Sequence, residues 1–256
     1  MLTILIKKFK KVLMLLIMAA LITTSLFEAN TIHGYTNVYC ANIEQATAQR
    51  KCEVIIRAGE YKGKPGKRIY LNNQTVKLPK DIPLRNDGDG NGFYVHEHDI
   101  NVKEAKALVE KLRALGIDAK LQIASDKTED LNAAGRISNK SNPYLYISIH
   151  HNYYNASSKG YFGMYNTNDT MGKLVADRLT NSIKNNNMVP QTSNRPNTGY
   201  IGELNKIHNT TTPVLLELGF FSNPDELEYI CSNQYVNYVS DNMAKEIEKI
   251  LNEHYK

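Results

Sequence analysis

The sequence has little cysteine, and its cysteines lack a metal-binding spacing. The three are Cys40, Cys52 and Cys231, and no two of them form a C-x-x-C pair. This excludes the cysteine-based zinc sites that stabilise many small domains. In an oxidising compartment a Cys52–Cys231 disulfide is allowed, although the sequence alone does not establish it.

The sequence also lacks a concentrated basic stripe, an internal repeat and a low-complexity segment. The formal net charge is +5, of which residues 1–41 contribute +3, so the rest of the chain carries only +2. We therefore expect no nucleic-acid partner, because nucleic-acid binding needs clustered positive charge. A chain of 256 residues with 42% hydrophobic and 22% charged residues is long enough for one sizeable globular core.

The N-terminus has the pattern of a secretory signal. Four lysines precede an apolar run from Val12 to Ile22, and polar residues follow the run. A membrane-spanning helix needs about 20 apolar residues, and this run is shorter. We expect a leader over residues 1–41, a linker over 42–52 and a secreted protein. Ala29 and Ala41 are the small-residue candidates for the cleavage site. The alternative is a leader that is not cleaved, which would be the only expected contact with a membrane.

From residue 53 onward, strand and helix patterns alternate. Strands are expected at 53–56, 117–123, 144–152, 160–165 and around Glu217, and amphipathic helices at 99–115, 131–139, 171–183 and 236–251. The run from Tyr144 to Asn152 is apolar without a break, which is typical of a central parallel strand covered on both faces. The pattern predicts an α/β domain, residues 53–256, with a mainly parallel central sheet flanked by helices.

Residues 61–93 form a long excursion with little apolar periodicity. Within it, Asp87, Asp89 and Asn91 place oxygen ligands at alternate positions, as the opening of a calcium loop does. The twelfth position of that loop is His98, where calcium loops have a bidentate Glu. A tight Asn/Asp/Gly turn is therefore the preferred interpretation, and calcium the weaker one.

Glu217 is a carboxylate in an otherwise apolar run, Pro213–Asn223. An ionised side chain buried there without a partner would cost several kcal/mol, so such a group is normally paired, bound to metal or chemically active. The alternative is a carboxylate at the end of the strand that faces water.

Three further residues are expected at the same edge of the sheet. Glu60 and His150 fall at or just beyond the C-terminal ends of predicted strands, and Glu97 begins the helix before Val102. Ligands of open α/β sheets bind at the carboxyl ends of the strands, so these groups converge with Glu217 on one crevice. Carboxylates and an imidazole suit zinc. Taken singly, Glu97 is explained equally well by its favourable position at a helix start, and only one of His150 and His151 faces a given cleft.

Several segments then resemble one family. Ser148–Asn152 and Pro213–Asn223 look like the two hallmark segments of the zinc-dependent N-acetylmuramoyl-L-alanine amidases of the Amidase 3 type. Glu97–Val102 is similar to the metal-binding Glu and first helix of that family, and Arg136–Asn139 is similar to a further arginine segment. The resemblance covers Val54 to Leu251, and it is most specific around Glu217.

The resemblance implies that His150 and Glu97 bind zinc and that Glu217 is the catalytic carboxylate. One segment departs from the family, whose first strand ends in Asp-Pro-Gly-His, whereas this chain has Arg57-Ala-Gly-Glu60. Glu60 is the expected third ligand, because Glu is a competent zinc ligand. His96 or His98 from the excursion is the alternative ligand, and loss of the metal is the third outcome.

The function implied is that of a secreted peptidoglycan hydrolase, located at the cell wall or on the outer side of the membrane. It would cleave the amide between N-acetylmuramic acid and L-alanine, with Arg136 and Arg195 as substrate-binding residues. The departure at Arg57 and Glu60 keeps a second hypothesis open, a catalytically impaired wall-binding or regulatory relative. A third is a zinc carboxypeptidase, which would release a terminal amino acid instead.

Overall fold

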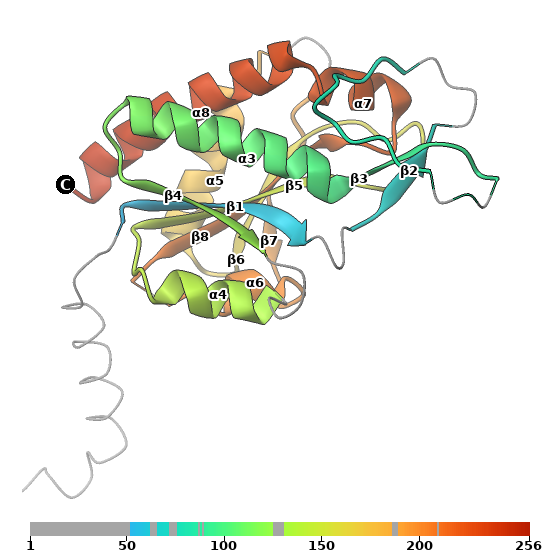
Figure 1. Ribbon diagram of the computed structural model, residues 1–256. Coiled ribbons are helices and arrows are strands. Elements are labelled where there is room, and N and C mark those ends of the chain that lie inside the picture. The colour runs from blue at the N-terminus through green and yellow to red at the C-terminus, as the bar shows by residue number, and fades with distance from the viewer. Residues whose placement is uncertain are drawn as a thin grey trace, which may run out of the picture. The chain divides into compact units, whose positions relative to one another are not determined.

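The computed structural model describes residues 52–61, 66–71, 76–86, 88, 90–124, 131–185, 189–208 and 210–256 (Figure 1). These residues belong to one compact unit, Gln49–Lys256. The expected leader lies outside the described residues, and so do Asp87 and Asp89 of the calcium-like loop. Within the described part of the chain, no helix is both long enough and apolar enough to cross a membrane.

A six-stranded sheet forms the centre of the domain. Its strands, in spatial order, are β4 (Ala119–Ala124), β1 (Val54–Tyr61), β5 (Leu145–Asn152), β8 (Thr212–Phe220), β6 (Phe162–Asn166) and β7 (Arg195–Asn197). The β1–β4, β1–β5, β5–β8 and β6–β7 pairs are parallel, and β6 pairs antiparallel with β8. Every residue of β5 except Asn152 is buried, which confirms the prediction of a central parallel strand.

Helices cover both faces of the sheet (Figure 1). On one face α3 (Glu97–Ala114), α5 (Thr170–Ser182) and α7 (Pro224–Ile230) contact the strands, and α8 (Asn233–His254) packs against these three helices. The other carries α4 (Leu131–Asn139) and the short α6 (Gly202–Asn205). The larger hydrophobic cluster lies on the α3 side and includes Ile56, Ile147 and Leu216, and a smaller one on the α6 side includes Tyr146 and Leu204. The predicted fold class is thereby confirmed.

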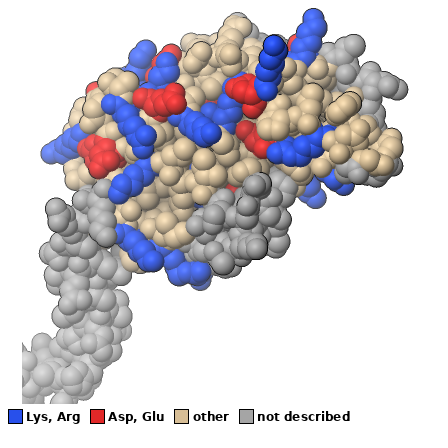
Figure 2. All heavy atoms as spheres, viewed as in Figure 1, with Lys and Arg blue, Asp and Glu red and all other residues tan. Residues whose placement is uncertain are grey.

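The extent of helix α3 agrees closely with the spacing of apolar residues in its sequence. Its apolar residues recur at three and four, and Leu108 and Leu112 are buried against the sheet and α8. The helix ends before Gly116, whose φ of 80° is the left-handed conformation that stops helices. On the surface of α3 and α8, basic and acidic side chains are interspersed (Figure 2).

Besides two strands next to α3, three short elements were not predicted. Strand β7 and helix α6 lie within the polar stretch 185–212, and α7 follows β8. The start of α7 has a recognisable signal, since the Asn223 side chain accepts hydrogen bonds from two backbone N–H groups and Pro224 occupies the first turn. The four residues of α6 are too few for any periodicity.

The excursion has some regular structure of its own. Strands β2 (Arg68–Tyr70) and β3 (Tyr94–His96) pair antiparallel just before α3. An ion pair between Arg85 and Asp99 and a 3.0 Å ion pair between Lys103 and Asp81 attach described parts of the excursion to α3.

Both described cysteines are free thiols. Cys231 is buried in the larger hydrophobic cluster and Cys52 in the smaller one. The disulfide that the sequence allowed between them is therefore not formed.

Candidate metal centre and active site

A pocket of about 250 Å³ lies at the carboxyl ends of the parallel strands. Strand register brings its residues together, because His150 on β5 is directly opposite Glu217 on β8. Glu60 reaches the pocket from the end of β1, and Glu97 from the first turn of α3. The sheet edge thus collects the four residues that the sequence indicated.

Three of these side chains are close enough to share one cation. Ligand atoms of Glu60, Glu97 and His150 all lie within 4.8 Å of one another. The Nδ1 atom of His150 is 3.1 Å from Oε1 of Glu97. Two atoms that each lie about 2.1 Å from a tetrahedral ion are about 3.4 Å apart, so this spacing fits a shared ion.

The end of β1 is irregular in a way that serves this arrangement. The β1–β4 pairing shifts register between Ala58 and Tyr61, and Glu60 has a φ of 59°. A non-glycine residue in this left-handed region is strained, and such strain concentrates at functional sites. Beside it, a Cβ added to Gly59 would lie 2.4 Å from two atoms of the His150 ring, so only glycine leaves room for the imidazole.

The charge of the pocket also favours a bound cation. Four carboxylates border it, those of Glu60, Glu97, Glu203 and Glu217. Burial, followed by repulsion from Glu97, raises the pKa of Glu60. A divalent cation would offset this repulsion, and the oxygen and imidazole donors present are those that zinc accepts.

Glu217 differs from the other three carboxylates because its Oε2 atom is buried and has no hydrogen-bond partner. Burial is the largest cause that raises its pKa, to about 7, and repulsion by Glu97 and Glu60 adds to it, although His150 acts in the opposite direction. A carboxylate with a pKa near neutrality can both take up and return a proton at physiological pH.

This pKa predicts how the stability of the metal-free protein changes with pH. The folded state binds the Glu217 proton more tightly than the unfolded state, whose value is near 4.5, so stability falls as pH rises from about 4.5 to about 7. Glu217→Gln removes that loss. In chemical denaturation of metal-free protein, we expect this variant to exceed the wild type by about 3 kcal/mol at pH 8 and by little at pH 4. Equal stabilities at pH 8 would contradict the raised pKa.

Sequence reasoning missed one pair in the site. Glu203 on α6 is fully buried, forms an ion pair with Arg57 on β1, and lies with its Oε1 atom 3.3 Å from Nε2 of His150. Burial raises the pKa of Glu203, but the hydrogen bond from His150 and the charge of Arg57 outweigh it and lower the pKa to about 2. Arg57 did carry a signal, since it is a charge in an apolar strand just as Glu217 is.

His151 points to the opposite side of β5, as the alternation of strand residues predicts. Its Nδ1 atom is 2.8 Å from Oδ1 of Asn101, and Asn101 in turn donates to Glu97 at 3.2 Å and to the carbonyl of Gly59 at 3.2 Å. Burial lowers the pKa of His151 to about 3, so its ring is neutral. His151 and Asn101 thus hold Glu97 in place from the α3 side.

The two alternative third ligands lie elsewhere. His98 has Nδ1 at 3.4 Å from the carbonyl oxygen of Gly59 and borders a separate pocket along α3. His96 packs edge-on against Tyr94, with ring centroids 5.1 Å apart. Among the described residues, the metal-type group contains Glu60 and neither of these histidines.

The two candidate substrate-binding arginines do not border the 250 Å³ pocket. Arg136 is exposed on α4, and the guanidinium of Arg195 on β7 lies 4.4 Å from the centre of the Phe162 ring.

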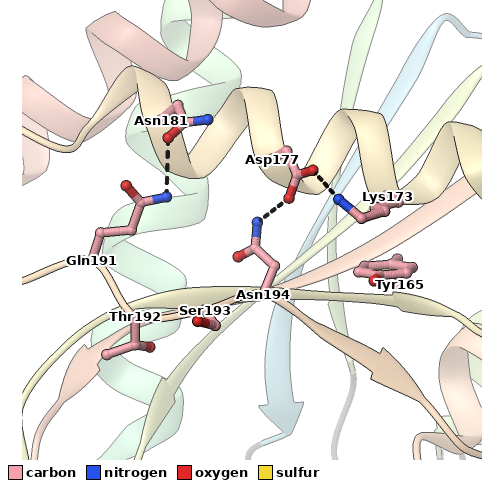
Figure 3. A pocket seen from close by; sticks show the side chains of 8 residues that line it. All are labelled: Tyr165, Lys173, Asp177, Asn181, Gln191, Thr192, Ser193 and Asn194. Atoms are coloured by element: carbon pink, nitrogen blue, oxygen red, sulfur yellow. Dashed lines mark hydrogen bonds and ion pairs between the residues drawn. The ribbon is translucent and has the colours of Figure 1, made fainter.

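A larger hollow of about 710 Å³ lies between α5 and residues 191–194 (Figure 3). Its side chains bond to one another. Asn194 donates to Asp177 at 2.7 Å, Lys173 pairs with Asp177, and Gln191 donates to Asn181 at 3.2 Å. Because these groups satisfy one another, whereas the smaller pocket collects four carboxylates and a histidine, the smaller pocket is the better candidate active site.

Comparison with known proteins agrees with this geometry. The family model of the N-acetylmuramoyl-L-alanine amidases, Amidase 3, matches residues 85–249, which is more than half of the chain. The match begins after β1, so it includes Glu97, His150 and Glu217 but not Glu60.

Among curated proteins, the chain is 29% identical over 133 residues to the germination-specific N-acetylmuramoyl-L-alanine amidase of Bacillus subtilis. That alignment covers 50% of this chain and 53% of the relative, so the chain spans about half the length of the relative it matches.

Solved structures share the fold. An N-acetylmuramoyl-L-alanine amidase from Clostridium difficile has a TM-score of 0.62 at 19% identity, over 80% of this chain and 100% of that one. An N-acetylmuramoyl-L-alanine amidase of Nostoc punctiforme has a TM-score of 0.60 at 21% identity, over 80% and 99% of the two chains. With the match over residues 85–249, these comparisons show that the chain belongs to the N-acetylmuramoyl-L-alanine amidase family of the Amidase 3 type.

Proposed function

We propose that this protein is a zinc-dependent amidase that cleaves the bond between the lactyl group of N-acetylmuramic acid and L-alanine in peptidoglycan. One observation supports it most strongly. Glu217 has an unpartnered carboxylate oxygen and a pKa near 7, and on β8 it lies directly opposite His150 of β5, one of the three metal-type ligands. A base beside a cation site is the arrangement that metal-assisted amide hydrolysis needs.

Glu60, Glu97 and His150 would hold the metal. When bound there, zinc would polarise the scissile carbonyl and make a water molecule easier to deprotonate. Asn101 donates hydrogen bonds to Glu97 and to the Gly59 carbonyl, and these bonds would hold Glu97 next to the end of β1, where Glu60 lies. Glu60 brings a negative charge where the family resemblance has histidine, so we expect weaker carbonyl polarisation here than in a site with two histidines.

Glu217 would perform the proton transfers. Its carboxylate accepts a proton from the attacking water as the water oxygen bonds to the carbonyl carbon. The C–N bond then breaks, and Glu217 returns the proton to the departing nitrogen of L-alanine. In the metal-free site the pKa is about 7, and a bound cation would lower it and favour the ionised form that accepts the proton.

We also propose a location for the protein and a role for the N-terminal residues and for two arginines. Residues 1–41 would export the protein to the cell wall or to the outer side of the membrane, and residues 53–256 would form the catalytic domain after a linker. Arg136 on α4 and Arg195 on β7 would meet the acidic stem peptide from outside the pocket, where their charges are available to a large substrate.

Mass analysis of products tests this function. Incubation of purified walls with the zinc-loaded protein is expected to release intact stem peptides with a free L-alanine amino terminus. Release of single C-terminal amino acids would instead identify a carboxypeptidase. Tight wall binding without zinc or product would identify a non-catalytic relative.

A further inference from the structure

The buried pair of Arg57 and Glu203 has no role in the mechanism above. Their side chains are 0% and 1% exposed, and the Tyr146 hydroxyl also donates to Oε2 of Glu203 at 3.4 Å. Removing two charges from water costs several kcal/mol per ion, and apolar residues of similar volume often replace such a pair without loss of stability. Stability alone is therefore a weak reason for this pair to exist.

The two oxygens of Glu203 have different partners. Oε2 pairs with Arg57, while Oε1 lies 3.3 Å from Nε2 of His150. Because strand residues alternate, Tyr146 and His150 share one face of β5, and the register places Arg57 on that same face. The chain of contacts from Arg57 through Glu203 thus ends on the imidazole.

The other nitrogen of that ring also faces a carboxylate, but one that belongs to the candidate metal site. Nδ1 of His150 is 3.1 Å from Oε1 of Glu97, within the group of metal-type ligands. A carboxylate that accepts from one ring nitrogen fixes both the proton position and the ring orientation, and it leaves the other nitrogen as the ligand. Without that acceptor, nothing would fix which ring atom of His150 faces Glu97.

We propose that Glu203, held by Arg57, is a positioning residue that accepts a hydrogen bond from Nε2 of His150 and thereby presents Nδ1 as the metal-binding nitrogen. This inference rests on the proposed function, because the positioning serves a metal ion. The orientation of the His150 ring, however, can be measured in the metal-free protein as well. The charge of Arg57 also keeps Glu203 from adding net negative charge to a pocket that already contains three other carboxylates.

Two double variants separate positioning from packing. Arg57→Met with Glu203→Leu removes both charges and the acceptor. Arg57→Met with Glu203→Gln also removes both charges, but the glutamine carbonyl still accepts from His150. Arg178→Met with Glu246→Met is the matched control, since that ion pair joins α5 to α8 away from the pocket at 2.5 Å.

The first readout is zinc affinity measured by competition with a chelator. The Leu variant is expected to bind zinc about 10- to 100-fold more weakly than the wild type, which is the usual effect of losing such a support. The Gln variant and the control are expected to remain within a few-fold of the wild type. Equal affinities in the Leu and Gln variants would overturn the positioning role.

The second readout needs no metal. In ¹⁵N-labelled metal-free protein, the wild type is expected to show a slowly exchanging Nε2–H resonance of His150, which the Leu variant loses and the Gln variant keeps. A protected proton on Nδ1 alone, or an Nε2–H signal that survives in the Leu variant, would overturn the inference. If the wild type bound no zinc, the proposed function would fall, while this resonance would still decide the orientation of His150.

Discussion

Glu217→Gln is expected to reduce the release of stem peptides from purified walls by about 10²- to 10⁴-fold, the range that general acid–base groups contribute. The amide of glutamine has nearly the shape of the carboxylate but neither accepts nor returns a proton in this pH range. The variant is expected to keep the fold and a full zinc content, because Glu217 lies outside the group of three ligands.

A matched control is Glu110→Gln, which makes the same chemical change at an exposed position on α3. It is expected to retain wild-type rates and zinc content. Release by Glu217→Gln at the rate of this control would remove Glu217 from the mechanism, and loss of zinc in Glu217→Gln would move it into the ligand set.

His150→Ala is expected to lose both zinc and activity. The variant removes the single nitrogen donor from the ligand group and leaves Glu97 and Glu203 facing each other across the space of the ring. Because zinc supplies several kcal/mol of transition-state stabilisation, activity should fall by about 10³-fold or more. Metal analysis after dialysis and the peptide-release assay measure the two effects.

His254→Ala is the control for a lost imidazole, since His254 lies in the last turn of α8. It is expected to keep one zinc per chain and the wild-type rate. Retention of stoichiometric zinc by His150→Ala would show that the metal is held by other residues.

Much of the fold followed from local patterns. The alternation of strands and helices, the unbroken apolar run of β5 and the stop at Gly116 were sufficient to predict the α/β class and the order of the long elements. They were sufficient because each of these elements buries a periodic apolar face, and such faces are visible in the sequence. The position of the candidate site was predicted from a different rule, that parallel strands end at a common edge of the sheet.

The finer arrangement of the site depended on features without a local pattern. The register shift and the left-handed backbone that aim Glu60 are set by packing against neighbouring strands, not by residue preference. Glu203 reaches His150 only because the chain returns to the sheet through α6, which is four residues long. Such contacts join residues 53 positions apart and cannot be predicted from periodicity.

We propose above all that Glu60, Glu97 and His150 hold a zinc ion beside Glu217. A crystal structure of the zinc-loaded protein, with data collected on both sides of the zinc absorption edge, tests it most directly. We predict one anomalous peak per chain, bonded to carboxylate oxygens of Glu60 and Glu97 and to Nδ1 of His150, with Glu217 nearby but unbonded. A peak coordinated by His96 or His98 in place of Glu60, or no peak in the pocket under zinc-saturating conditions, would contradict it.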